Sequence, residues 1–282
     1  MSSNPIDAQF NLRARHPNFQ EYLDRNESLS ATALASLPHQ LDLPYGDHPL
    51  QTIDFFPASK PNAPIAIFIH GGYWRALDKR SYRFLAHALR GTGCATSLVN
   101  YRLMPEARMS DIVDDVLKAI ELTARVARDN GANPQRLHLS GHSAGGHLAL
   151  ASAMRIQSQG NSLFPSIQSL FSLSGLFDLD PIRQSFLNEE LNLSEQEVGE
   201  FSPLRDTGFH LPFPSVFAVG DGETDAFIDQ SKAMSERILA DGNDCVFELA
   251  PSLNHFDIVF DFGLQGGVLN GKLLDLVSQE SD

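Results

Sequence analysis

The sequence predicts an α/β protein whose mostly parallel central sheet is flanked by helices. Strand-like and helix-like segments alternate from residue 50 to the end of the sequence, and this alternation implies crossover connections between parallel strands. Some of the strand-like segments are short, continuously apolar runs, which are typical of strands buried on both faces. The 282 residues contain no internal repeat and no linker rich in Gly and Ser, so we expect a single domain over residues 1–282.

The first half of the sequence begins with a polar arm, residues 1–45, in which we expect a helix at about residues 18–36. Residues 65–69 (IAIFI) predict a buried strand that ends abruptly at His70-Gly71-Gly72, where a functional loop can begin. The next expected elements are a helix over residues 79–89 that ends near Gly91, a strand over residues 94–99, and a long amphipathic helix over residues 111–128 that ends near Gly131.

The second half repeats the same unit and adds one irregular segment. We expect a strand at 136–139, a turn at 140–146, a helix at 147–155, strands at 169–173, 215–219 and 245–249, and helices at 226–240 and 268–277. Residues 176–214 contain four prolines and have only weak helical periodicity. An insertion of this length over a compact sheet usually covers a site, so we expect residues 176–214 to form a short cap.

Charge and hydropathy exclude several classes of partner. The chain has 21 Lys and Arg against 35 Asp and Glu, a net charge of -14, which repels the phosphate backbone of nucleic acids. No apolar run is long enough to span a membrane, and residues 1–7 lack the pattern of a signal peptide, so we expect a cytoplasmic protein. Cys94 and Cys245 lie in strand-like apolar runs without a CxxC neighbour, which indicates small buried hydrophobes instead of redox or zinc-binding thiols.

A pentapeptide at the end of an apolar strand carries the main chemical signal. Gly141-His-Ser143-Ala-Gly145 fits the pattern Gly-x-Ser-x-Gly, in which a strand turns sharply into a helix and exposes the serine hydroxyl. The pattern alone is common, but here it lies between a strand and a helix rich in Ala and Leu, as the motif requires. Ser143 is therefore the candidate nucleophile.

A serine nucleophile needs a base and a carboxylate that orients the base. His255 is the histidine that follows the last expected strand, which makes it the candidate base. The strand at 215–219 leads to three carboxylates, Asp221, Glu223 and Asp225, and spacing alone does not select one. We favour Glu223 because the acid normally lies a few residues beyond the strand end, and Asp225 remains the alternative.

Reaction at a carbonyl also needs N–H donors for the developing oxyanion, and the residue after the nucleophile, Ala144, supplies one. The segment His70-Gly-Gly-Tyr-Trp74 follows a buried strand and is similar to the HGGG-type loop that supplies the other donors in esterases. An ordinary glycine turn is the alternative interpretation of this loop.

Together these motifs resemble the α/β-hydrolase superfamily, in the branch of hormone-sensitive-lipase-like esterases, and most closely the kynurenine formamidase (arylformamidase) family. The resemblance rests on the HGGYW loop and the GHSAG pentapeptide. It also covers four further stretches: Asn100-Tyr101-Arg102-Leu103 with Pro105, Ser174-Gly-Leu-Phe-Asp178-Leu179-Asp180-Pro181, Phe227-Ile-Asp-Gln230-Ser231, and His255-Phe256-Asp257.

The resemblance implies a role for each candidate residue. Ser143 would attack a formyl or acyl carbonyl, and His255 would take its proton and return it to the leaving group. Counting back from Phe227 places the family's acid on Glu223, where animal formamidases have aspartate.

By the same resemblance, the backbone N–H groups of Gly72, Tyr73 and Ala144 would form the oxyanion hole. The side chains of Tyr73 and Trp74, with residues 176–214, would form the wall against an aromatic substrate. Plain core packing is the other interpretation of these side chains.

The implied function is hydrolysis of a formyl or other small acyl amide of an arylamine such as N-formyl-L-kynurenine, in tryptophan catabolism. A short-chain carboxylesterase is the alternative, and a catalytically inactive binding module is a remote one. The mechanism needs neither a metal nor an organic cofactor, and the expected partner is a small-molecule substrate, with neither nucleic acid nor membrane. The sequence leaves a homodimer open and identifies no residue for the charged end of such a substrate.

Overall fold

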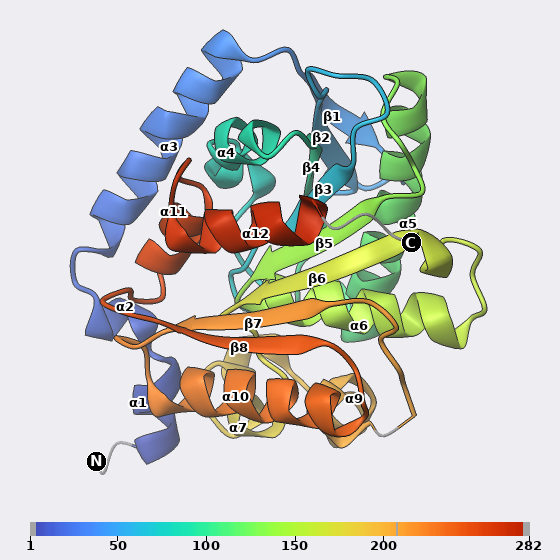
Figure 1. Ribbon diagram of the computed structural model, residues 1–282. Helices are drawn as coiled ribbons and strands as arrows, with labels where there is room; N and C mark the ends of the chain where they lie inside the picture. Colours follow the sequence, from blue (N-terminus) through green and yellow to red (C-terminus); the bar gives the residue numbers. More distant parts are fainter. Residues whose placement is uncertain (1–3, 207, 279–282) are drawn as a thin grey trace.

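The computed structural model describes residues 4–206 and 208–278, which are built around one eight-stranded sheet (Figure 1). The strand order is β1-β2-β4-β3-β5-β6-β7-β8. The strands are β1 (Gln40–Pro44), β2 (Thr52–Phe56), β3 (Ile65–Ile69), β4 (Ala95–Val99), β5 (Leu137–His142), β6 (Ile167–Leu173), β7 (Ser215–Gly220) and β8 (Cys245–Ala250).

The strands from β3 onwards pair in parallel, as the alternating pattern predicts. β1 and β2 add antiparallel pairs at one edge, with β2 against β4. All five residues of β3 are buried, which contributes about 1.5–3 kcal/mol for each large apolar side chain. The structure has the strand β1 within residues 1–45, which were expected to form only an arm. This strand was not expected because the sequence has no apolar run there, and its alternating burial comes from pairing with β2.

The helices cover both faces of the sheet. They are α1 (Pro5–Phe10), α2 (Leu12–Arg15), α3 (Phe19–Ser36), α4 (Leu85–Gly91), α5 (Met109–Asp129), α6 (Ala144–Ser158), α7 (Asp180–Arg183), α8 (Asn188–Leu191), α9 (Glu195–Phe201), α10 (Asp225–Ala240), α11 (Asp257–Phe262) and α12 (Val268–Ser278), with 3-10 turns η1 (Lys79–Tyr82), η2 (Phe164–Ser166) and η3 (Pro203–Arg205). One apolar core lies between the sheet and α5, α6 and α10. A second core lies on the opposite face, under α4, α11 and α12.

Two expected elements differ from the structure. The helix expected over residues 79–89 is divided into η1 and α4. The turn expected over residues 140–146 is much shorter, because β5 pairs with β6 as far as His142 and α6 already begins at Ala144.

The carboxyl ends of the parallel strands meet beneath the arm and the 176–214 segment. That segment forms α7, α8, α9 and η3, with α9 started by a capping box between Ser194 and Glu197. The N-terminal helices contact it, and the backbone N–H of Phe186 donates to Asp7 Oδ1 at 2.8 Å. The N-terminal helices and the 176–214 segment are therefore joined above the carboxyl ends of the strands.

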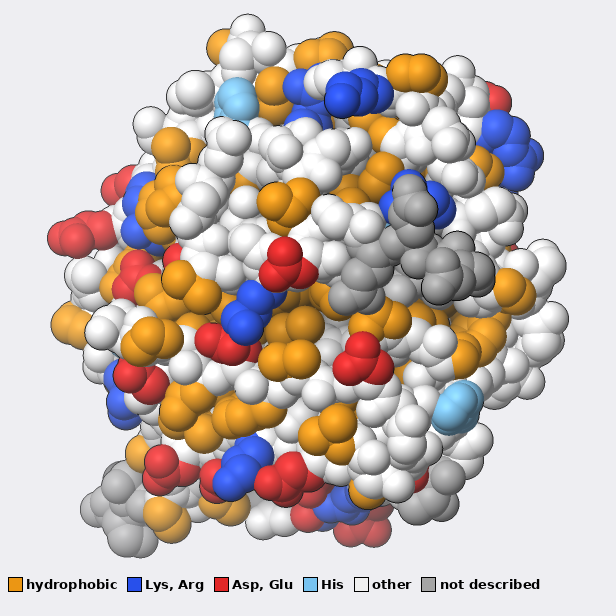
Figure 2. Space-filling model, in the orientation of Figure 1, with side chains coloured by type: hydrophobic (Ala, Val, Ile, Leu, Met, Phe, Trp, Pro, Cys, Tyr) orange, Lys and Arg blue, Asp and Glu red, His pale blue; other side chains and the backbone are white. Residues whose placement is uncertain are grey.

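Charged and apolar side chains are mixed on the face of the molecule shown in Figure 2. The most exposed large apolar residues include Val246 and Leu249 on the edge strand β8 and Val268 on α12. Within the described residues, no helix combines the length and the apolar character that a membrane crossing would need.

Candidate active site

Ser143 lies at the abrupt junction between β5 and α6. Its backbone has φ 56° and ψ -121°, a conformation that costs a residue other than glycine about 1–3 kcal/mol. The neighbouring strand stabilises it, since the backbone N–H of Ser143 donates to the carbonyl of Leu173 at 2.7 Å. The strained turn brings the side chain into the pocket described below.

The glycines on either side of Ser143 are required by close backbone contacts. A Cβ on Gly141 would lie 2.1 Å from the carbonyl oxygen of Gly145. A Cβ on Gly145 would lie 2.0 Å from the carbonyl oxygen of Ile69, on the neighbouring strand β3. Only glycine fits at either position, which is the physical reason for the Gly-x-Ser-x-Gly spacing.

Glu223 and His255 form a buried pair. His255 Nδ1 lies 2.6 Å from Glu223 Oε2, and the Glu223 side chain is fully buried. Its other oxygen, Oε1, accepts from the Ser174 hydroxyl at 2.6 Å and from the backbone N–H of Gly220 at 2.9 Å. These two donors and His255 hold both oxygens of the carboxylate in place.

The other two carboxylates after β7 lie elsewhere. Asp221 is exposed and accepts from the backbone N–H of Ser252 at 2.7 Å, which joins the β7 and β8 loops. Asp225 is exposed at the first position of α10. Glu223 is the one of the three that contacts His255.

His142 also contacts His255. Its Nε2 donates to the backbone carbonyl of His255 at 2.8 Å, and the two ring centroids are 4.6 Å apart. Burial, followed by the nearby His255, lowers the pKa of His142 well below its usual value. His142 is therefore a neutral donor that holds the His255 loop, a role that its place inside the pentapeptide did not indicate.

The HGG loop packs directly against Ser143. A Cβ on Gly71 would lie 3.1 Å from Ser143 Cβ, and Gly72 and Tyr73 have positive φ values of 108° and 49°. In the part of the chain that the structure describes, the backbone N–H groups of Gly72, Tyr73 and Ala144 have no intramolecular acceptor. They are free to donate to a bound ligand.

The side chains of Tyr73 and Trp74 have different surroundings. Tyr73 lines the pocket, and its hydroxyl donates to the carbonyl of Phe10 in the N-terminal arm at 2.9 Å. Trp74 is fully buried in the core, where its indole N–H donates to His147 Nδ1 at 3.2 Å, and it does not line the pocket. This corrects the expected position of Trp74, because the indole fills space beneath the loop and so supports it from within.

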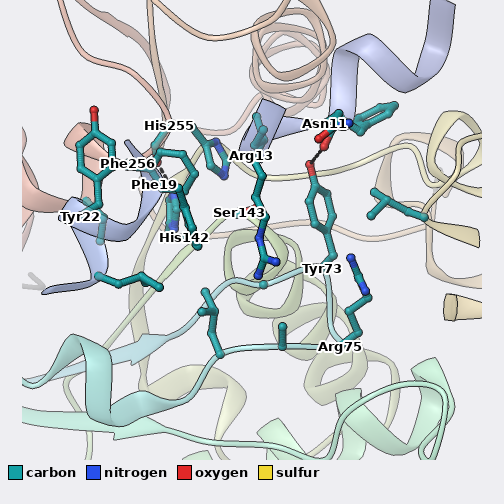
Figure 3. A pocket seen from close by; sticks show the side chains of 18 of the residues that line it. Asn11, Arg13, Phe19, Tyr22, Tyr73, Arg75, His142, Ser143, His255 and Phe256 are labelled. Carbon is teal, nitrogen blue, oxygen red and sulfur yellow. Dashed lines mark hydrogen bonds between the residues drawn. The ribbon is translucent and has the colours of Figure 1, made fainter. Parts of the chain in front are cut away.

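Ser143, His142 and His255 lie in one cavity of about 140 Å³ (Figure 3). Its walls come from the N-terminal arm and α3, the HGG loop, the 176–214 segment and the segment around Phe256. The aromatic lining includes Phe19, Tyr22, Tyr73 and Phe256. The contribution of the arm was not expected, because no local sequence pattern reveals which distant loop a short helix will cover.

Across residues 4–206 and 208–278, no three His, Cys, Asp or Glu side chains are grouped so that they could hold a metal ion. Ser143 and His255 line the pocket, and the Glu223 carboxylate contacts His255 from outside the lining.

The fold is that of an α/β hydrolase. The chain belongs to that family, whose model, described as "alpha/beta hydrolase fold", matches residues 66–258. It is 29% identical over 247 residues to kynurenine formamidase from Danio rerio, covering 85% of this chain and 82% of the relative. It is 26% identical over 247 residues to isoprenylcysteine alpha-carbonyl methylesterase ICME of Arabidopsis thaliana, covering 79% of this chain and 58% of the relative.

Solved structures agree with this placement. A proposed thioesterase from Silicibacter sp. TM1040 has a TM-score of 0.84 and 26% identity, covering 95% of this chain and 98% of the other. Esterase LipW from Mycobacterium marinum has a TM-score of 0.74 at 18% identity, covering 92% and 89%, a likeness that concerns the fold alone. The protein is a hydrolase of the α/β-hydrolase type.

Proposed function

We propose that this protein is a serine hydrolase that cleaves a small acyl amide, foremost a formyl amide, of an arylamine, with N-formyl-L-kynurenine as the reference substrate. The observation that carries the proposal is the buried Glu223–His255 pair in contact distance, with His255 in one pocket with Ser143. The likeness to kynurenine formamidases supports the formyl amide as the scissile group.

The proposed reaction proceeds through a covalent intermediate. Ser143 Oγ attacks the formyl carbon while its proton passes to His255 Nε2, and the Glu223 carboxylate stabilises the imidazolium through Nδ1–H. The oxyanion accepts from the free N–H groups of Gly72, Tyr73 and Ala144. His255 then protonates the leaving arylamine, and water attacks the formyl-serine with His255 as base, which releases formate.

The pocket suits a substrate with one aromatic ring. Its volume of about 140 Å³ is close to the roughly 150 Å³ of an engineered cavity that binds benzene. Phe19, Tyr22 and Phe256 offer ring faces and edges for stacking on such a group.

A short-chain carboxylesterase is the second candidate, because the relatives include methylesterases. The same serine, base and oxyanion donors would cleave an ester, and the two functions differ in the leaving group that the pocket receives.

The test compares kcat/KM for N-formyl-L-kynurenine and for 4-nitrophenyl acetate, with Ser143→Ala as the blank and His255→Ala as the second variant. We expect turnover of the formyl amide and a loss of several powers of ten in both variants. A higher kcat/KM for the formyl amide than for the ester would establish the amidase, because an amide is intrinsically harder to cleave than an activated ester. Ester cleavage alone would establish the carboxylesterase. No turnover of either compound, together with no labelling by a fluorophosphonate probe, would leave only a binding module.

A further inference from the structure

The pocket of Ser143 differs in charge from the rest of the molecule. The chain has a net charge of -14, yet the residues that line the pocket include two arginines, Arg13 and Arg75, and no aspartate or glutamate. Glu223 stands behind His255 and is not part of the lining. A ligand in this pocket therefore meets positive charge in an otherwise acidic protein.

Only one of the two arginines is paired with a carboxylate. Arg75 forms an ion pair with Glu190 of α8. Arg13, on α2, makes no ion pair or hydrogen bond with any of the described residues, and its guanidinium carbon lies over the Phe19 ring, 5.0 Å from the ring centroid. The cation of Arg13 is available to a ligand.

The Arg13 side chain lines the same pocket as Ser143. Figure 3 shows it extending from the arm into the pocket. Its neighbour Arg15 takes a different direction and donates to the carbonyl of Gly222 at 3.2 Å. Packing on Phe19 limits the conformations of Arg13 and leaves the N–H groups of the guanidinium free for recognition.

A guanidinium with free N–H groups beside an aromatic lining is suited to a carboxylate, which it can bind through two parallel hydrogen bonds. We propose that Arg13 binds a carboxylate on the substrate, so that this hydrolase selects aromatic substrates that carry a carboxylate over those that lack one. This inference rests on the proposed function, in which Ser143 cleaves the bound molecule. Arg13 would act in binding, at a distance from the scissile bond, and so change KM more than kcat.

The experiment uses a matched substrate pair, N-formyl-L-kynurenine and its primary carboxamide, in which the carboxylate is replaced by a neutral group. Because Arg13 is exposed at the mouth of the pocket, we expect the full-length protein to prefer the carboxylate about tenfold in kcat/KM, mostly through KM. Arg13→Gln should remove this preference and Arg13→Lys should keep part of it. Arg125→Gln, which removes an exposed arginine of α5 outside the pocket, should leave it unchanged.

A binding measurement separates this inference from the reaction. Ser143→Ala protein is titrated with the same two compounds, with and without Arg13→Gln. Equal binding of the two compounds, or a preference that survives Arg13→Gln, would overturn the role of Arg13. Preferential binding that depends on Arg13 without turnover by the unmodified protein would instead overturn the proposed reaction.

Discussion

Replacement of Glu223 by glutamine tests the central pair of the site. The substitution keeps the size of the side chain and an oxygen that can still accept from Ser174 and Gly220. It removes the negative charge and turns an N–H donor toward His255 Nδ1, which is 2.6 Å from the carboxylate. The imidazole then favours the tautomer with its proton on Nε2, where it cannot accept the proton of Ser143.

The size of the effect follows from the charge of the pair. Two unit charges about 4 Å apart, at an effective dielectric constant of about 20, interact with about 4 kcal/mol. Loss of this stabilisation of the imidazolium corresponds to a fall in kcat of roughly 10³-fold, at about 1.4 kcal/mol for each factor of ten. The altered tautomer adds to this loss, so we expect a fall of 10³- to 10⁴-fold.

The assay is kcat for the better substrate of the two tested above, with thermal unfolding to establish that the variant is folded. Asp225→Asn is the matched control, because it removes an exposed carboxylate two residues away, and it should keep kcat within about threefold. A folded Glu223→Gln variant within tenfold of the original kcat would refute the reasoning, and a larger loss in Asp225→Asn would move the role to that residue.

Three further predictions concern the same framework. His142→Phe keeps a ring but loses the donor to the His255 carbonyl, so kcat should fall about tenfold with little change in KM. His142→Gln, which can donate again, should recover part of the lost kcat. An unchanged kcat in His142→Phe would exclude a positioning role. Gly141→Ala should lower the free energy of unfolding by at least about 3 kcal/mol in urea titrations. Gly199→Ala, with open space around its Cβ in α9, should change the free energy of unfolding by less than about 1 kcal/mol. Equal effects of the two substitutions would contradict the packing described here. Burial lowers the pKa of His147 to about 4, so the unfolded chain binds more protons than the folded chain between about pH 6.5 and 4. The free energy of unfolding should therefore fall as the pH drops through that window. His147→Gln should flatten the dependence of the melting temperature on pH, and an equally steep dependence in this variant would argue against His147 as the origin.

The strand ends were the part of the site that the sequence could reveal. Ser143, Glu223 and His255 each follow an apolar run, and parallel strands bring their carboxyl ends to one edge of the sheet, so order along the chain predicted proximity in space. Glu223 was favoured over Asp225 by its distance from the strand, and the structure brings Glu223 to His255.

The other features of the site depend on packing between segments that are distant in sequence, and such packing produces little pattern in the local sequence. β5 extends through Gly141 and His142 because it pairs with β6, although glycine has low strand propensity. The indole of Trp74 follows Tyr73 directly, yet the positive φ of both residues sends one side chain into the core and the other to the pocket. The free guanidinium of Arg13 became recognisable only once the arm was placed over Ser143.

The division of the pocket between strand ends and covering helices has an evolutionary consequence. The proposed reacting groups lie just beyond the ends of β5, β7 and β8, and the close backbone packing at Gly141 and Gly145 leaves no room for a Cβ beside the serine. The wall that meets the substrate comes in large part from short helices of the arm and of residues 176–214, remote in sequence from the nucleophile. Substitutions in those coverings can therefore change which molecules are admitted while the bond-breaking apparatus stays intact, which explains how relatives named for amide and ester cleavage share one scaffold.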